Sequence, residues 1–456
     1  MRYAKYRKSG ISWLPEVPEG WEVVRNKAFL SLTDERVGDR KNNFPLLSLT
    51  KQGVIIRDIS SGKGKFPKEF DSYLVVRPNN LVFCLFDIEE TPRTVGLVQN
   101  LGMLTGAYTN FEVNQSIVYP EFAYYYYLFV DEGKRLAPYY TGLRKVVKTN
   151  TFLSLRFPLP PLSEQKGIAA YLDEKCGKVD ALVAAKERQV KLLKELRERV
   201  IADAVTGKIS PTQGAENETS RTSRTRMLAH PSGSASPNLP SEAELLRRIS
   251  REKTKPSGVF WQPMMPAHWV VRKLKYVLSK LRRERYPDAE LLVCTNKGKV
   301  IKRGESKMGL VSDDISIYQG VKQGDLLIHG MDTWHGAVAV SDDDGMCTPV
   351  VHVCDSRDDK RFIAYYLRNM ARGRVFKLIS NGVRQNTSDF RSWEKLAAIP
   401  IILPPLSEQQ DIVEYIERKT AKIDELAQKL EDEVKKLKEF RERLVADVVT
   451  GQRKVV

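Results

Sequence analysis

The chain has 456 residues, of which 42% are hydrophobic and 29% are charged, and its formal net charge is +17. This length allows two or three domains that each bury a core, and the composition excludes a disordered or fibrous chain. The excess of Lys and Arg predicts a polyanionic partner, because cations gain free energy by displacing counterions from phosphates. Nucleic acid is the first candidate and a membrane surface the second. Since no apolar run approaches the roughly 20 residues that span a bilayer, we expect a cytoplasmic protein.

Cysteine and histidine usage argues against metal and redox chemistry. The cysteines are odd in number, widely scattered and never in a CxxC pair, which excludes a disulfide framework or a zinc cluster and predicts buried thiols. They are Cys84, Cys176, Cys294, Cys347 and Cys354. The histidines lie only in the middle and second half of the chain, which argues against a duplicated catalytic pair. A metal site built from His329 and His335 stays open as a minor alternative.

The first predicted domain covers residues 1–158. It begins with the stretch SGISWLPEVPEGW, which ends at Trp21. The run SYLVVRPNNLVFCLF predicts strands and FAYYYYLFVDEGKRL predicts a helix, so we expect a mixed α and β domain. The tyrosines 124–127 fit either a base-stacking platform or core packing. Core packing is favoured, because Phe362, Tyr365 and Tyr366 hold a similar place in the second half.

A hinge and a long helix are predicted for residues 159–207. The motif LPPLSEQ at 159–165 favours a helix start, because its prolines cannot occupy a helix interior, Ser163 can cap and Glu164 suits the positive first turn. Gly207 supplies the end of the helix. We expect about 43 helical residues, or ~65 Å. Residues 208–256 then predict a polar linker to about 240, followed by the short helix SEAELLRRISREK.

The second half of the chain repeats the first. A second domain is predicted for residues 257–402, opened by SGVFWQPMMPAHW, and a second hinge and helix for 403–456, opened by another LPPLSEQ. About half of the positions are identical from this motif to the VTG that ends at Gly451. The two domains themselves diverge, with faint echoes such as Thr50 and Gly53 against Thr295 and Gly298. A similar framework around dissimilar domains predicts identical docking with different ligands.

Apolar residues recur every seven positions along both helices, which predicts a coiled-coil seam. The positions are Leu172, Val179, Lys186, Leu193 and Val200 in the first helix, and Ile416, Ile423, Leu430, Leu437 and Leu444 in the second. Helices related by an internal duplication pair most simply about a pseudo-two-fold axis and are then antiparallel. The predicted fold is therefore α+β: two mixed α/β target-recognition domains separated by a long antiparallel two-helix coiled coil. Two amphipathic helices packed on separate domains are the alternative.

Catalytic motifs are missing from the sequence. We find no glycine-rich cofactor turn, no NPPY-like motif of a DNA methyltransferase and no GxxxxGK[ST] phosphate loop, and SGKGK at 61–65 is too short for a dinucleotide fingerprint. We therefore expect a non-catalytic binding protein with no catalytic, cofactor-binding or metal-binding residues of its own.

Basic and amide side chains in predicted loops are the candidate DNA-binding residues, because Arg and Lys suit guanine edges and phosphates while Asn and Gln suit adenine. In the first domain these are Lys51, Arg57, Lys63, Lys65, Arg144 and Lys145. In the second they are Asn296, Lys297, Lys302, Arg303, Arg384, Gln385 and Asn386. Arg144 and Arg384 are the strongest, because each follows a repeated glycine at an equivalent position.

The duplicated order of the WLPEVPEGW stretch, two PPLSEQ hinges, two helices that end in VTG and two divergent domains resembles the specificity subunit of type I restriction-modification systems. The resemblance implies that each domain reads one half of a bipartite, asymmetric DNA site and that the coil length fixes the gap. It also implies two modification subunits that carry S-adenosylmethionine and methylate adenine, and two restriction subunits that use ATP and Mg²⁺ for translocation and cleavage. The long linker departs from the simplest pattern of the family.

Two rival functions stay open. A structural scaffold would use the helices to join two protein-binding domains, with the basic charge serving only solubility. A free-standing nuclease is a more distant alternative, since scattered acids near Lys are common in a chain that is 29% charged.

Overall fold

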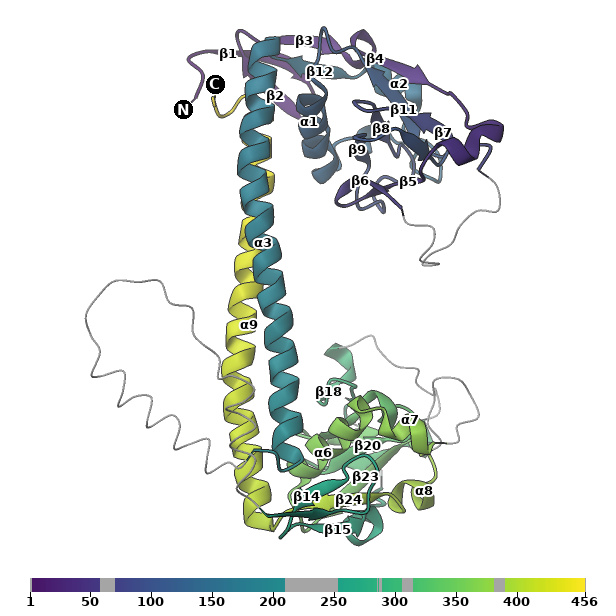
Figure 1. Cartoon of the computed structure of the whole chain (residues 1–456), viewed down its shortest axis with the longest axis vertical. Helices are drawn as coiled ribbons and strands as arrows, with labels where there is room; N and C mark the ends of the chain where they lie inside the picture. Colours follow the sequence, from purple (N-terminus) through teal and green to yellow (C-terminus); the bar gives the residue numbers. More distant parts are fainter. Residues whose placement is uncertain are drawn as a thin grey trace, which may run out of the picture. The chain divides into compact units, whose positions relative to one another are not determined.

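The computed structural model describes residues 2–57, 70–209, 253–284, 286, 289–305, 315–380 and 390–455. It divides into two compact units (Figure 1). Unit 1 comprises residues 1–188 and 430–456, and unit 2 comprises residues 189–429. Each unit contains one end of both long helices, α3 (Leu162–Val205) and α9 (Leu406–Val449), which have 44 residues each. The linker expected at 208–240 and the short helix after it lie outside the described residues, apart from their ends.

Unit 1 is a set of short antiparallel sheets with one main helix. A leading hairpin is formed by β1 (Tyr6–Ile11) and β2 (Leu14–Pro18), and β3 (Glu22–Arg25) pairs with β12 (Arg156–Leu159). The central sheet has the order β4 (Leu30–Thr33), β11 (Thr109–Val113), β8 (Leu81–Phe83) and β9 (Val95–Leu97). The remaining pairs are β5 (Leu47–Thr50) with β6 (Gly53–Ile56) and β7 (Leu74–Val76) with β10 (Gly102–Leu104). The helices are α1 (Pro120–Glu132) and α2 (Thr149–Ser154).

Unit 2 repeats this strand order. Its leading hairpin is β13 (Thr254–Pro256) with β14 (Met264–Pro266), and β15 (Val270–Lys273) pairs with β24 (Pro400–Leu403). Its central sheet is β16 (Leu278–Lys280), β23 (Val351–Ser356), β20 (Leu326–His329) and β21 (Val338–Val340). The remaining pairs are β17 (Leu292–Cys294) with β18 (Val300–Lys302) and β19 (Gln319–Val321) with β22 (Gly345–Cys347). The helices are α6 (Lys360–Arg372), α7 (Val375–Ile379) and α8 (Trp393–Ala397).

The mixed α and β content expected from the sequence is confirmed, and the predicted strands around residues 74–83 are present. The stretch from Arg361 to Ile379 lies in α6 and α7. It forms two helices rather than one, because Arg374 takes a left-handed backbone conformation with φ of +58° that ends the first helix.

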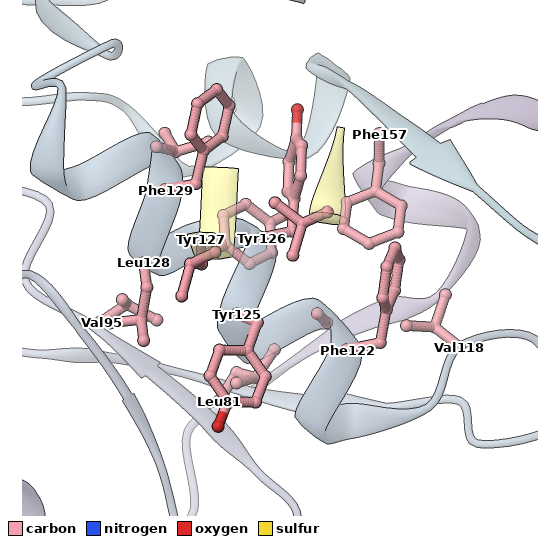
Figure 2. Packing of buried hydrophobic residues seen from close by; sticks show 14 of the residues in the cluster. Leu81, Val95, Val118, Phe122, Tyr125, Tyr126, Tyr127, Leu128, Phe129 and Phe157 are labelled. Carbon is pink, nitrogen blue, oxygen red and sulfur yellow. The ribbon is translucent and has the colours of Figure 1, made fainter. Parts of the chain in front are cut away.

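Aromatic residues of α1 form the core of unit 1 (Figure 2). Tyr126 and Tyr127 are buried, and the Tyr126 ring lies 4.8 Å from the ring of Phe157. In the core of unit 2, Tyr366, the equivalent of Tyr126, and Phe362, the equivalent of Phe122, are buried. Core packing, favoured over base stacking for this tyrosine run, is therefore confirmed. All five cysteines are free and buried, as expected.

Both long helices begin two residues earlier than they would if Ser163 and Ser407 capped them. The first helical bonds run from the Gln165 amide to the Pro161 carbonyl and from Gln409 to Pro405. Ser163 and Ser407 therefore lie inside the first turn, and the expectation that they cap was wrong. The predicted ends are confirmed: Gly207 and Gly451 have φ of +72° and +73°, a conformation that costs other residues about 1–2 kcal/mol.

Within each unit the two long helices run antiparallel. In unit 1, Lys186 of α3 pairs with Glu433 of α9 at 2.6 Å, and Asp180 of α3 pairs with Arg441 of α9 at 2.8 Å. The residue number in α9 therefore decreases as the number in α3 increases. Of the ten predicted seam positions, Leu172, Ile416 and Leu444 are buried and the other seven are half-buried. A second line was missed because its members include small or polar residues. It comprises Cys176, Val183 and Val190 in α3, and Thr420, Ala427 and Val434 in α9.

No helix in the described part of the chain is both long and apolar enough to cross a membrane.

Candidate nucleic-acid interface

Each unit carries a two-stranded hairpin whose turn begins with a threonine and contains a glycine. In β5–β6 the Thr50 hydroxyl donates to the Gly53 carbonyl at 3.0 Å, and in β17–β18 the Thr295 hydroxyl donates to the Lys299 carbonyl at 2.8 Å. Gly53 and Gly298 have positive φ angles of +103° and +72°. The faint sequence echo of Thr and Gly therefore marks a turn in each unit that uses a glycine with positive φ, although the loop has two residues in β5–β6 and three in β17–β18.

The hairpins are attached to their units by matching backbone contacts. Leu46 forms a parallel bridge to Met103 in unit 1, and Leu291 forms one to Met346 in unit 2. The amides of Arg57 and Arg303 donate to the carbonyls of Leu46 and Leu291, both at 2.8 Å. Two of the predicted DNA-binding residues thus start from equivalent, fixed backbone positions.

In unit 1 the predicted residues lie in two separate loops. Lys51 is exposed at the tip of β5–β6, and Arg57 follows β6 and is half-buried. Arg144 and Lys145 lie instead in a turn that is closed by a bridge between Thr141 and Val146. Lys63 and Lys65 are outside the described residues.

Arg144 is held by acidic and aromatic neighbours. Its guanidinium donates to the Asp87 carboxylate at 2.7 Å and lies 5.0 Å from the centroid of the Phe86 ring. The hydrogen bond to Asp87 raises the pKa of Arg144, and an ion pair with Glu89 raises the pKa of Lys145. Because Arg144 and Glu89 are exposed and Asp87 and Lys145 are only half-buried, these surface pairs contribute little to stability. The side chain of Leu143, which the sequence search passed over, is fully exposed beside Arg144.

In unit 2 the β17–β18 hairpin brings four predicted residues together. Asn296 and Lys297 are exposed at its tip. Lys302 and Arg303 lie at its far end, where the Lys302 ammonium pairs with Glu290 at 3.2 Å. The other predicted residues, Arg384, Gln385 and Asn386, fall outside the described residues.

The repeated hinge motif has a role that the sequence reading missed. Glu164, assigned only to the helix dipole, accepts a hydrogen bond from the indole of Trp21 at 3.2 Å, and Glu408 accepts one from Trp269 at 3.1 Å. Both tryptophans are fully buried. The next residue, Gln409, accepts a hydrogen bond at 2.8 Å from the backbone amide of Asp359, the residue before α6. The recurrence of Trp and Glu at matching positions was the available signal for this contact.

The end of the second long helix in each unit lies against the leading hairpin and the buried tryptophan: α9 ends there in unit 1 and α3 in unit 2. A β-carbon added to Gly451 would collide with the Pro18 ring, and one added to Gly207 would lie 2.5 Å from the Pro266 ring. The Tyr6 hydroxyl also donates to the Gly451 carbonyl at 2.9 Å. Each unit is thus held between the start of one long helix and the end of the other.

In the described part of the chain, no group of three or more His, Cys, Asp and Glu residues is arranged to hold a metal ion. His329 lies near Asp332 at 3.4 Å, and burial lowers its pKa.

Comparison with known proteins matches residues 266–436 to the family model of the type I restriction modification DNA specificity domain. The chain is 23% identical over 310 residues to the StySPI specificity subunit of Salmonella potsdam, which covers 67% of this chain and 59% of that relative. It is 21% identical over 309 residues to the EcoDI specificity subunit of Escherichia coli, covering 67% of this chain and 64% of the relative. The alignments thus span less than two thirds of either relative.

A solved structure shares the fold. It is described as "Structural basis underlying complex assembly and conformational transition of the type I R-M system". The match has a TM-score of 0.61 at 16% identity and covers 95% of this chain and 98% of the solved chain. The resemblance drawn from the hinges, helices and paired domains is therefore confirmed by sequence and by fold.

Proposed function

Because this chain carries a type I restriction-modification DNA specificity domain and resembles the specificity subunits of such systems, we propose that it selects the DNA sequence on which partner subunits act. The recognised site is bipartite and asymmetric, with one half read by each unit. The chain itself is non-catalytic, acts in the cytoplasm, and directs adenine methylation and DNA cleavage by its partners.

One observation carries this proposal: the same strand order occurs twice, and the residues differ where the two hairpins are exposed. The two-residue tip of β5–β6 presents Lys51 and Gln52, whereas the three-residue tip of β17–β18 presents Asn296 and Lys297 in the reverse order, followed by Gly298. Amide and ammonium groups prefer different base edges. Two hairpins held alike but equipped differently suit two unlike half-sites better than one repeated sequence.

The long helices are proposed to act as an antiparallel spacer that relates the two halves by a pseudo-two-fold axis. Arg441 pairs with Asp180 in unit 1, and Arg197 pairs with Asp424 at 2.9 Å in unit 2. Arg197 and Arg441 occupy equivalent positions of the repeat, and so do the two aspartates. A duplicated cross-helix pair is the expected product of such symmetry. The helical length then sets the gap between half-sites, since base pairs advance ~34 Å per turn.

The partners follow from the family. Two modification subunits would bring S-adenosylmethionine, and two restriction subunits would bring ATP-dependent translocation and Mg²⁺-dependent cleavage. No cofactor is assigned to this chain.

Mapping of modified adenines tests the proposal. Cells would carry this chain with its modification subunit, and a second strain would carry a chain whose residues 22–158 come from another specificity subunit. We expect a split motif in the first strain, and in the second strain a motif with one half changed and the gap kept. A methylation pattern that does not depend on this chain would refute the proposal.

The scaffold hypothesis gives a different result in the same experiment. Exchange of residues 22–158 would then alter protein partners and leave the methylated motif unchanged. Incubation of the purified chain with Mg²⁺ and plasmid DNA tests the nuclease alternative, for which we expect no cleavage.

A further inference from the structure

A cavity of about 570 Å³ lies beside the β17–β18 hairpin of unit 2. Its walls come from the hairpin turn, from α6, from the 3-10 turn η7 (Thr333–His335), and from the parts of α3 and α9 that belong to this unit. The cavity therefore adjoins the exposed tip that carries Asn296 and Lys297.

The lining is rich in positive charge. Its cationic side chains are Arg197, Lys297, Lys299, Arg368 and Arg372, against the acids Glu198 and Asp424. Both acids are already engaged: Arg372 pairs with Glu198 at 2.8 Å, and Arg197 pairs with Asp424 at 2.9 Å. Lys297, Lys299 and Arg368 form no ion pair with any carboxylate in the described part of the chain. The cavity thus has three cations in excess.

Arg368 is positioned by its surroundings rather than by an acid. Its guanidinium donates to the Lys297 carbonyl at 2.9 Å, which aims it at the hairpin turn. Burial lowers the pKa of Arg368; Glu198 opposes this effect and Arg197 adds to it. Gly298 is essential to the arrangement, because a side chain there would collide with the guanidinium. A partly dehydrated guanidinium next to further cations is costly unless an anion joins it.

Unit 1 has different chemistry at the same place. Phe122, Tyr126 and Gly133 of α1 match Phe362, Tyr366 and Gly373 of α6, so Leu128 and Glu132 stand where unit 2 has Arg368 and Arg372. An apolar residue and an acid replace two guanidinium groups. The cationic cavity is a property of unit 2, and neither the common fold nor the helix framework requires it.

We propose that this cavity binds a phosphate group, and that the phosphate belongs to the backbone of DNA engaged by the β17–β18 hairpin. A planar guanidinium and two ammonium groups match the several oxygens of a phosphate. The volume exceeds that of a bare ion, and Trp334 and Tyr365 in the lining leave an apolar side for the attached sugar or base. The DNA source rests on the proposed function; the phosphate chemistry rests on the cavity alone.

Salt-dependent DNA binding by the full chain tests the DNA source. Fluorescence anisotropy with a duplex of about 40 base pairs would be recorded from about 50 to 200 mM salt for the parent and for Arg368→Gln and Lys299→Gln. Loss of one phosphate contact lowers the slope of log Kd against log salt by about 0.9. We expect this change, with affinity about tenfold weaker, for Arg368→Gln. Lys273→Gln removes an exposed charge from the same unit outside the cavity and should leave the slope unchanged.

Two controls show whether a loss of binding comes from misfolding. The first is the unfolding midpoint of each variant. The second is Arg368→Lys, which keeps the charge and should restore most of the slope. Lys299 is exposed, so its replacement does not endanger the fold. If both cavity variants bind DNA as the parent does, the DNA source is wrong.

Calorimetry with adenosine monophosphate and with inorganic phosphate identifies the other source. Binding of either probe by the parent that is lost in Arg368→Gln, without an effect on DNA, supports the phosphate site and assigns it to a free ligand. The calorimetry with small probes stays informative if the parent does not bind DNA. That outcome would count against the proposed function and not against the phosphate site. No effect of either variant with DNA or with the small probes overturns the inference.

Discussion

The helix of unit 1 that packs on its central sheet, α1, and its counterpart in unit 2, α6, share an aromatic core face and differ at their last turns. Phe122 and Tyr126 are buried in one, and Phe362 and Tyr366 in the other. Toward the end, α1 presents Leu128 and Glu132 where α6 presents Arg368 and Arg372. The face that packs against the sheet tolerates few residues, because interiors are close-packed. The two helices differ here because Leu128 is buried in the core of unit 1, whereas Arg368 is only partly buried and lines the cavity of unit 2.

The common framework can be broken most strongly at its tryptophan. Trp269 is fully buried against α9 and donates to Glu408, so Trp269→Ala should destabilise the protein by about 3–5 kcal/mol. Urea unfolding measures the effect. Phe260→Ala is the matched control, because that side chain is 61% exposed, and it should change stability by less than about 0.5 kcal/mol. Similar losses for the two variants would contradict the role of Trp269 as an anchor.

The contact between the leading hairpin and the helix end gives the next largest effect. Gly451→Ala must strain the backbone and also displace the Pro18 ring, so we expect a loss of about 2–4 kcal/mol. Gly258→Ala has nearly the same φ, +74°, with open space around it, and should cost only about 1–2 kcal/mol. The difference between the two unfolding free energies isolates the contact. Equal values would mean that Pro18 yields at no cost.

Glu132 distinguishes the two units by its response to pH. Desolvation raises the pKa of Glu132 to about 7, and Glu442 adds to this although the side chain keeps contact with solvent. A carboxyl group whose pKa is higher in the folded than in the unfolded protein, where it is about 4.3, contributes stability at low pH that is lost between about pH 4 and 7. Glu132→Gln should therefore flatten the decline of the thermal midpoint over that range. An unchanged pH profile would show that solvent keeps this carboxyl group charged.

The cross-helix ion pairs should have the smallest effect. Arg197 and Asp424 are partly exposed, so a double-mutant cycle with Arg197→Gln and Asp424→Asn should give a coupling of about 0.2–1 kcal/mol. The cycle with Arg441 and Asp180 should give a similar value, because the pairs occupy equivalent places in the repeat. A large difference between the two cycles would argue against symmetric use of the helices.

Sequence patterns predicted the framework because its elements are local or duplicated. Prolines before 162 and 406 and glycines at 207 and 451 set the limits of the long helices, and the sevenfold spacing gave one line of their contact. The second line was missed, since Thr420 and Ala427 are not recognisable as seam residues without the partner helix. The strand pairings that form the two hairpins bring several candidate DNA-binding residues close together. No local sequence pattern shows these pairings.

By itself, the sequence determined the duplicated order, the helix ends and the basic charge, all of which follow from residue type and spacing. Only the tertiary structure decided that Glu164 and Glu408 hold buried tryptophans, and that Arg368, from α6, meets the turn of a hairpin about 70 residues earlier in the chain. Such contacts join segments remote in sequence, and their partners are chosen by packing and by the need to satisfy buried polar groups rather than by any local preference.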